Sequence, residues 1–219
     1  MPRAVRRAWR AGDLGATNDM LVRSAEIQCG AQAAREARRE DFVHPREGTI
    51  RGTTQLIRAA LSNNLPRVLQ LVQLGTPLDL VEESNKYSAL HWASLVGHER
   101  VAKALLDGKY KGRGANINLL HLGSWTPLLD ASRHGREGIV RLLLERGARL
   151  DMQSANGFMA LHWAVFGNHA VVLEALCSAQ GAAAALALRD YAGRTPLALA
   201  IEYGYAACKA VLRAHGAPA

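Results

Sequence analysis

The chain has 219 residues, with 27 Lys and Arg against 19 Asp and Glu, and a formal net charge of +8. Its three cysteines, Cys29, Cys177 and Cys208, are too few and too scattered for a disulfide framework or a zinc knuckle, which predicts a reducing compartment. No apolar run approaches the roughly 18 residues that a membrane span needs, so we expect a soluble protein without membrane insertion.

The positive charge is spread along the whole chain. Residues 1–51 hold ten Arg against seven acidic side chains, an excess of +3, and the remaining residues hold 17 basic against 12 acidic side chains, an excess of +5. Binding to a phosphate backbone normally needs a stripe of several cationic contacts, and no segment of the sequence forms one. Solvated surface charge therefore explains the composition, and we do not expect a nucleic-acid partner.

Residues 1–51 form a basic N-terminal extension. Its first ten residues combine four Arg with small and apolar side chains in a pattern that predicts a short amphipathic helix. Two interpretations of this helix stay open. The first interpretation is a mitochondrial presequence, although Asp13 and Asp19 follow at once and presequences avoid acids. Alternatively it belongs to a degenerate half-repeat, because residues 8–14 align with residues 59–65.

A pattern of about 33 residues then repeats five times, which is typical of repeat architectures. It is marked by a Leu and by an Ala three positions later: Leu56 and Ala59, Leu90 and Ala93, Leu128 and Ala131, Leu161 and Ala164, Leu197 and Ala200. Seven positions after each Leu stands Asn or Gly, the residues that most readily adopt a left-handed backbone. Each repeat is therefore predicted to hold two short helices with a turn between them. In the third repeat, residues 139, 140, 142, 143 and 144 are predicted to form the buried face of the second helix.

The sequences Leu90–Ala93, Thr126–Leu128, Leu161–Ala164 and Thr195–Ala198 resemble the ankyrin repeat, over about residues 52–217. The resemblance implies a mainly α solenoid, in which helix-turn-helix repeats are linked by β-hairpin loops. It also implies that His91 and His162 brace adjacent hairpins. The predicted repeats are about 52–85, 86–123, 124–156, 157–192 and 193–217.

Both ends of the array carry polar residues where an inner repeat is apolar. Arg67 and Gln70 mark the first repeat, and Lys209 and Arg213 mark the last, so we expect a capping repeat at each end. A shortened chain that begins near Glu47 should therefore keep its helical circular-dichroism signal and its cooperative melt. Aggregation of that chain would show instead that the extension covers the first repeat.

Two insertions lengthen the period, and neither predicts chemistry. The first, residues 108–114, is rich in Gly and basic residues but lacks the Gly-Lys-Ser/Thr ending and the preceding strand of a phosphate-binding loop. We expect a surface loop there, with Lys109, Lys111 and Arg113 as basic contact residues. The second, residues 181–185, is rich in Ala and predicts a lengthened helix end or a loop.

The sequence also predicts no enzyme, cofactor or metal site. Its eight histidines do not gather with carboxylates or thiolates as metal ligands would, and four of them have structural positions in the repeats. There is no serine nucleophile motif and no His-Glu-x-x-His motif.

Four positions of the repeat change their chemistry from copy to copy, which indicates solvent exposure. They lie three residues before the marker Leu and two, five and six residues after it, and the resemblance places them along a concave groove that binds partners. The predicted partner-binding residues, Tyr191 included, are Tyr87, Trp92, Trp125, Asp130, Arg133, His134, Phe158, Trp163, Phe166, Tyr191, Arg194 and Tyr203. Exposure is favoured for Tyr87, Trp125 and Phe158, whereas packing between repeats is an equal alternative for Trp92 and Trp163.

Two functional hypotheses follow. The first is a protein-protein interaction module or adaptor, cytoplasmic or nuclear and monomeric alone, that binds its partner through this aromatic groove. The second is a structural subunit of a larger assembly, nucleic-acid-containing or organellar, that is anchored by the basic segments. Binding that weakens steeply with salt would favour the second hypothesis, because phosphate contacts release counterions.

Overall fold

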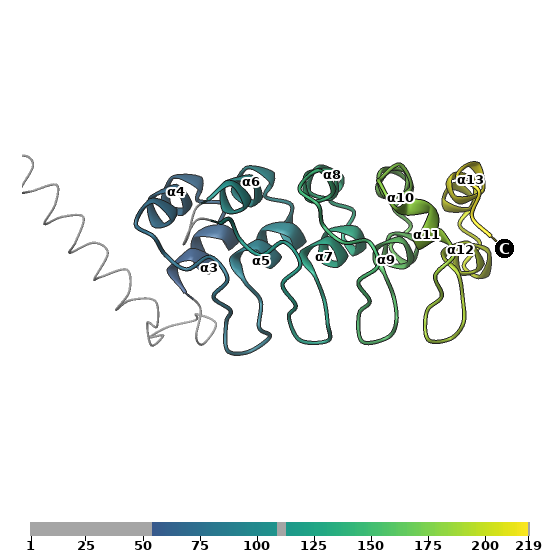
Figure 1. The fold of residues 1–219 in the computed structure, drawn as a ribbon, viewed down its shortest axis with the longest axis horizontal. Coiled ribbons are helices and arrows are strands. Elements are labelled where there is room, and N and C mark those ends of the chain that lie inside the picture. Colours follow the sequence, from purple (N-terminus) through teal and green to yellow (C-terminus); the bar gives the residue numbers. More distant parts are fainter. Residues whose placement is uncertain (1–53, 109–112, 219) are drawn as a thin grey trace, which may run out of the picture.

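The structure is a computed structural model that describes residues 54–108 and 113–218. The N-terminal extension, and with it both interpretations of its first helix, lies outside the described residues, as do Lys109 and Lys111. Within the described ranges the chain forms a solenoid of paired helices with no strand, so the predicted fold is confirmed (Figure 1). None of the described helices combines the length and the apolar character that crossing a bilayer requires.

The helices form two rows, and hairpin loops project beyond the inner row (Figure 1). The inner row is α3 (Gln55–Leu61), α5 (Ala89–Val96), α7 (Pro127–Arg133), α9 (Ala160–Phe166) and α12 (Pro196–Glu202). The outer row is α4 (Leu65–Gln73), α6 (Glu99–Asp107), α8 (Glu137–Glu145), α10 (Ala170–Cys177) and α13 (Ala206–Ala214). Each helix packs on its partner in the same repeat and on the next helix of its own row.

Polar caps fix the starts of the inner helices. The hydroxyls of Thr54, Thr126 and Thr195 each accept a hydrogen bond from the backbone N–H three residues later. Pro127 and Pro196 then occupy the first helical position, where the missing N–H has no intrahelical partner to lose. The Thr-Pro-Leu motif is therefore a helix-start signal, as predicted.

The predicted left-handed turn is present in all five repeats. The residues there have φ between 55° and 100°, namely Asn63, Gly97, Gly135, Asn168 and Gly204. This conformation ends the inner helix and reverses the chain into the outer one.

The core lies between the two rows and runs through every repeat. In α8, Ile139, Val140 and Leu143 are completely buried, whereas Leu142 and Leu144 are half-buried. The second insertion forms the short helix α11 (Ala182–Leu186), which packs on α10. The second insertion is thus helical, but it forms a separate short helix and does not lengthen the end of α10.

The hairpin loops are joined by few strand-like bonds. Isolated antiparallel bridges connect Val81 with Ser88 and His121 with Trp125. Adjacent loops are also linked to each other, because the Leu122 N–H donates to the Asn85 carbonyl at 3.1 Å and the Ala155 N–H to the Gly123 carbonyl at 2.7 Å. The hairpins therefore form a connected edge beside the inner helices.

Candidate functional site

A row of aromatic rings, here called the aromatic ladder, crosses the hairpin bases and inner helices. It comprises Trp92, Tyr87, His121, Trp125, Trp163, Phe166, Tyr203 and Tyr205, in spatial order. Neighbouring ring centroids are 4.0 to 6.1 Å apart. These are the separations at which aromatic pairs stabilise one another. The ladder joins side chains from four repeats into one surface.

The first half of the ladder is closely stacked. The Tyr87 ring lies 4.0 Å from the His121 ring and 5.0 Å from the Trp92 ring. The His121 Nε2 atom is 3.5 Å from the Asp130 Oδ2 atom, and both side chains are buried. Burial and the nearby Asp130 carboxylate raise the pKa of Tyr87 to about 12. The rings in this half of the ladder are therefore tightly packed, and Tyr87 stays uncharged at neutral pH.

Two carboxyl groups lie beneath the stacked rings. Burial raises the pKa of the Glu82 carboxyl, and the Trp92 side chain and the His121 imidazole offset this only in part. Burial also raises the pKa of Asp130, again against His121. Because desolvation outweighs the attraction to His121, both acids favour the neutral form more than an exposed acid does.

The predicted bracing role of His91 and His162 is confirmed. The Nδ1 atom of His91 accepts the Ser88 N–H at 3.2 Å, so Nε2 carries the proton and donates to the carbonyl of Leu119 at 2.9 Å. The Nε2 atom of His162 lies 3.0 Å from the Arg194 carbonyl. Each ring thus connects its own helix to the next hairpin. Burial, with a smaller effect of His121, lowers the pKa of His91 to about 3.

This pKa predicts an acid-dependent loss of stability. The unfolded imidazole takes up a proton near its ordinary pKa of 6.5, whereas the folded one stays neutral until about 3. The His91 contribution to stability is therefore complete above 6.5 and falls, as the pH drops toward 3, by up to about 1.4 kcal/mol per pH unit. The free energy of unfolding in urea should fall between about pH 7.5 and about pH 5.5 by less in His91→Gln than in the unmodified chain, because glutamine cannot titrate. Equal losses in both chains would contradict the assignment.

Arg133 lies over the centre of the ladder. Its Cζ atom is 5.3 Å from the Trp125 ring centroid and 5.0 Å from the Trp163 ring centroid, and the side chain is exposed. These distances are those of cation–π contacts. The Arg133 carbonyl accepts a hydrogen bond from His169 Nε2 at 3.0 Å, which ties the end of α7 to the next repeat. Both the backbone and the guanidinium of Arg133 are thereby positioned.

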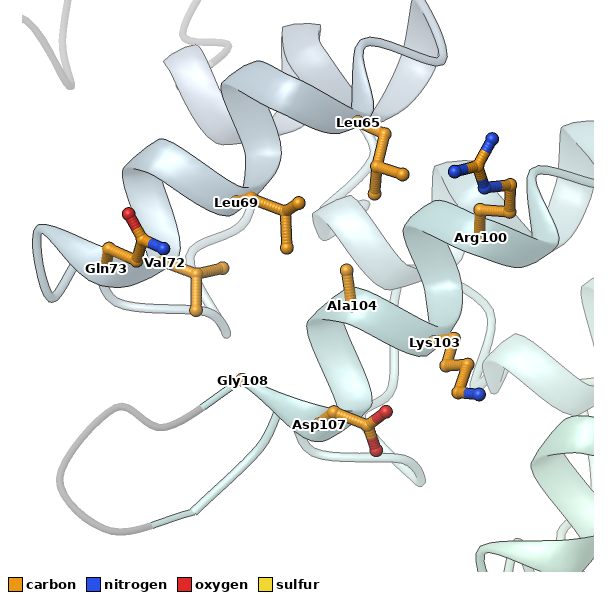
Figure 2. Close-up of a pocket in the computed structure, with 9 residues that line it drawn as sticks. All are labelled: Leu65, Leu69, Val72, Gln73, Arg100, Lys103, Ala104, Asp107 and Gly108. Carbon is orange, nitrogen blue, oxygen red and sulfur yellow. The ribbon is translucent and has the colours of Figure 1, made fainter.

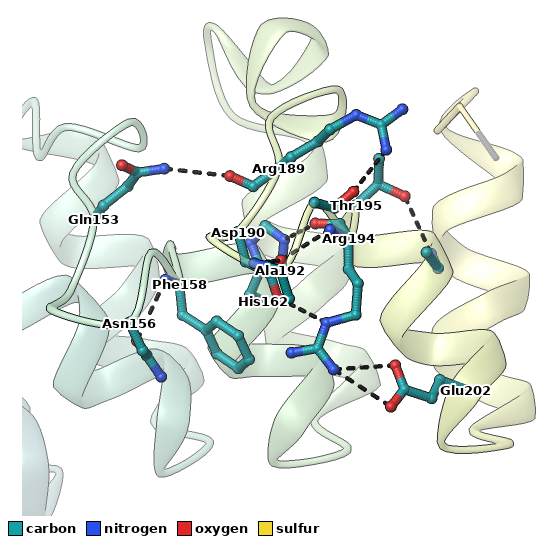
Figure 3. Close-up of polar contacts among 12 residues, drawn as sticks. Gln153, Asn156, Phe158, His162, Arg189, Asp190, Ala192, Arg194, Thr195 and Glu202 are labelled. Carbon is teal, nitrogen blue, oxygen red and sulfur yellow. Dashed lines mark hydrogen bonds and ion pairs between the residues drawn. The ribbon is translucent and has the colours of Figure 1, made fainter.

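Arg194, in contrast, is paired with acids (Figure 3). Its Nε atom donates to Asp190 at 2.8 Å, and its Nη1 atom donates to the Glu202 carboxylate at 3.1 Å. Burial alone would raise the pKa of Asp190, but hydrogen bonds from the Arg194 backbone and guanidinium outweigh it and the pKa is lowered. The charge of Arg194 is thus neutralised by Asp190 of its own hairpin and by Glu202 of α12.

The prediction of exposure was wrong for Phe158, which is only 6% exposed. Its ring packs 4.9 Å from Trp163 and 5.4 Å from His162, and the Arg194 guanidinium of the following hairpin covers it at 5.7 Å (Figure 3). The prediction was wrong because this cover comes from another repeat.

The second residue after the marker Leu is also not a solvent-facing position throughout. Asp130 is 1% and Trp163 6% exposed, and Leu199 is fully buried. Only Arg58 and Trp92, in the first two repeats, are half-buried there. Trp163 is covered by rings on two sides, so packing between repeats accounts for it.

The remaining predicted residues differ in accessibility. Tyr87, Trp92, Trp125 and Arg194 are half-buried; Arg133, His134, Phe166, Tyr191 and Tyr203 are exposed. Phe166 is 43% and Tyr203 39% exposed, so the accessible part of the ladder lies toward the C-terminal repeats. Tyr191 is 72% exposed but stands apart from the ladder, at the tip of the last hairpin. Arg113 is exposed and lies 3.9 Å from Asp79.

His121 was missed by the sequence reasoning. It stands four positions before Trp125, just as Asp190 stands four positions before Arg194, and both residues donate their backbone N–H across the hairpin base. Glu82 makes the same bond to Tyr87, but its hairpin is one residue longer. The four-residue spacing to the position of Trp125 could have identified His121 from the sequence. It was obscured because the hairpin of Glu82 has one more residue and because the residue type changes from repeat to repeat.

A concave feature away from the ladder, here called the outer groove, lies between α4 and α6 (Figure 2). Its volume is about 690 Å³, and its apolar lining comes mainly from Leu65, Leu69 and Val72 of α4 and Ala104 of α6. Over the described ranges, no group of His, Cys, Asp and Glu could hold a metal ion.

Comparison with known proteins identifies the repeats. A family model described as ankyrin repeats in three copies matches residues 56–154 and again residues 146–218. XBAT31 of Arabidopsis thaliana, whose name provisionally assigns it to the E3 ubiquitin-protein ligases, is 33% identical over 152 residues, which are 65% of this chain and 31% of XBAT31. A Caenorhabditis elegans homolog of transient receptor potential cation channel subfamily A member 1 is 31% identical over 150 residues, which are 68% of this chain and 12% of the channel.

A third relative, Rabankyrin-5 of Mus musculus, is 38% identical over 78 residues, which are 36% of this chain and 6% of that protein. This chain therefore spans less than a third of the length of each of these relatives. The family model covers the repeat array, and the chain belongs to the ankyrin-repeat family, whose repeats are protein-protein interaction modules.

Proposed function

We propose that this chain is a non-catalytic interaction module that binds a segment of a partner protein along the accessible part of the aromatic ladder. The observation that carries the proposal is the exposed stretch of Arg133, Phe166 and Tyr203, which rests on the more buried rings of Trp125 and Trp163. Aromatic and Arg side chains dominate the energetics of protein interfaces. Here they are held by stacking before any partner arrives, so little ordering entropy is lost on binding.

The buried groups of the ladder support a non-catalytic role. His121 and Asp130 lie within 3.5 Å of each other, as an acid-base pair would, but both are buried, and the His121 ring is stacked on Tyr87 and Trp125. A general base must come within hydrogen-bonding reach of its substrate, which these positions prevent. The pair serves to hold the hairpin against α7.

A photocrosslinking experiment tests the proposal. The photoreactive residue p-benzoyl-phenylalanine is introduced at Tyr203 in one chain and, as a matched control, at Leu69 in another; both positions are exposed, but Leu69 lies in the outer groove. We expect the Tyr203 position to crosslink a protein from native extract, and excess unmodified chain to suppress the product. Crosslinks that form at Leu69 but not at Tyr203 would place the partner on the outer face and contradict the proposal.

The alternative role, a structural subunit held by basic segments, rests on residues 1–51, Lys109 and Lys111, outside the described residues. Arg113 does not strengthen it, since this side chain lies 3.9 Å from the Asp79 carboxylate. If the affinity of the chain for the partner identified by crosslinking falls steeply between about 50 and 200 mM salt, that result would favour the subunit role. The affinity of a partner bound through the aromatic rings should change little with salt. We further propose that the adaptor is cytoplasmic or nuclear.

A further inference from the structure

We infer that the aromatic ladder accepts an extended peptide segment that places one carboxylate on Arg133 and apolar side chains on Phe166 and Tyr203. The inference rests on the proposed function and names the chemistry of its partner. Its basis is charge complementarity, because Arg133 is an exposed cation on the ladder whose guanidinium makes no salt bridge or hydrogen bond to an acid among the described residues.

Two other arginines differ from Arg133 in being paired with acids. Arg194, whose guanidinium lies over the Phe158 ring, is bound to Asp190 and Glu202. On the outer face, Arg141 pairs with Glu137 at 2.9 Å. Arg133 instead has the faces of two indoles, at 5.3 and 5.0 Å from its Cζ atom.

The geometry leaves the hydrogen-bonding edge of Arg133 available. A guanidinium has five N–H donors, and among the described residues those of Arg133 make no hydrogen bond. A carboxylate can take two parallel hydrogen bonds from such an edge, an arrangement stronger than a neutral pair. The two indoles restrict the guanidinium by their contact, and the His169 bond to the Arg133 carbonyl at 3.0 Å holds the backbone. Arg133 is therefore a preorganised seat for a carboxylate.

Nearby acids do not fill this seat. Asp130 lies one helical turn earlier, but it is 1% exposed and its Oδ2 atom lies 3.5 Å from Nε2 of the His121 imidazole. Glu202 is accessible, but it is held by Arg194. A second acid placed further along the ladder would face Glu202 and be repelled, which restricts the acid of the partner to the position of Arg133.

The residues beyond Arg133 determine the rest of the segment. The Phe166 ring lies 5.4 Å from Trp163 and 6.1 Å from Tyr203, and both exposed rings present apolar surface. Single-stranded RNA also combines stacking with negative charge, but it needs cations along its backbone. Arg194, the other arginine near these rings, is already neutralised by Asp190 and Glu202. The ladder therefore suits an acidic peptide better than single-stranded RNA.

Selection from a random dodecapeptide display library tests the inference. The full chain and two variants are used as bait: Arg133→Gln, and Arg141→Gln as a control that removes the same charge from the outer face. We expect peptides selected on the full chain and on Arg141→Gln to be enriched in Asp or Glu at one position, next to apolar residues. Peptides selected on Arg133→Gln should show no such enrichment.

Affinities of one selected synthetic peptide then complete a double-mutant cycle. Arg133→Gln should weaken binding about tenfold or more, because a charge-assisted hydrogen-bonding pair is lost, and Arg141→Gln less than about twofold. Replacing the peptide acid by its amide should weaken binding to the full chain by a similar factor and have little effect on Arg133→Gln. Arg133→Lys, which keeps the charge without the planar fork, should recover only part of the affinity.

Several results would overturn the inference. Acid enrichment that is absent, or that persists on Arg133→Gln, contradicts it. So does a 12-nucleotide oligouridylate that displaces the peptide and itself depends on Arg133, since the seat would then hold a phosphate. Acid-free peptides that are lost with Phe166→Ser would remove the inference and leave the proposed function standing. Peptides that are insensitive to Phe166→Ser, or a library that yields none, would remove both.

Discussion

Replacement of Leu143 by Ala should lower the free energy of unfolding by roughly 2 to 5 kcal/mol. Leu143 is completely buried in α8, which packs on α6, α7 and α10. Truncation leaves a cavity between three helices that cannot close without moving a repeat. Because the stability of a solenoid is carried by contacts between adjacent repeats, the loss should lower the midpoint of the whole array in urea, followed by circular dichroism.

The matched control is Leu69→Ala, on the outer helix of the first repeat. Leu69 is 43% exposed, so its truncation removes less buried area and should cost less than about 1 kcal/mol. A midpoint that Leu143→Ala leaves unchanged, or that both variants lower equally, would contradict the register of the repeats.

Replacement of Trp125 by Ala should weaken partner capture by at least about 2 kcal/mol, or thirtyfold in affinity. The sequence alone predicts little change in melting temperature for this variant, and the structure revises that expectation. Trp125 is half-buried, packs 4.4 Å from Trp163 and supports the Arg133 guanidinium. We therefore expect an earlier melt together with weaker capture of the partner.

Two further variants separate these effects. Trp125→Phe keeps an aromatic face and should restore most of the melting temperature and part of the binding. Tyr191→Ala removes a ring that is 72% exposed and lies outside the ladder, so capture should stay close to normal. Normal capture by a folded Trp125→Ala chain would show that the partner uses another surface.

The features that the sequence predicted correctly are local. A Thr cap, a Pro at the first helical position and a Gly or Asn in the left-handed region each act on the backbone within a few residues. Their recurrence located the inner helices and all five turns, including the turns at Asn63 and Asn168. The bracing roles of His91 and His162 came from the family resemblance and are confirmed by hydrogen bonds to the next repeat, at the carbonyls of Trp125 and Arg194.

The accessibility of the ladder was less predictable, because it depends on contacts between repeats. Phe158 is covered by Arg194 from the next hairpin, and Asp130 of α7 is buried beside His121, which ends the preceding repeat. A pattern within one repeat carries no information about such cover. The outer groove also escaped prediction, since it arises from the gap between α4 and α6 rather than from a motif in either helix.

The central claim is tested most directly by measuring how tightly two single variants bind the partner that crosslinking identifies. Phe166→Ser removes an exposed ring of the ladder, and Leu69→Ser makes a similarly apolar to polar change on the outer face, where the leucine is equally exposed at 43%. Isothermal titration calorimetry with purified partner should show binding about tenfold or more weaker for Phe166→Ser and within about twofold of normal for Leu69→Ser. Unchanged binding to Phe166→Ser together with weakened binding to Leu69→Ser would show that the aromatic ladder is not the site.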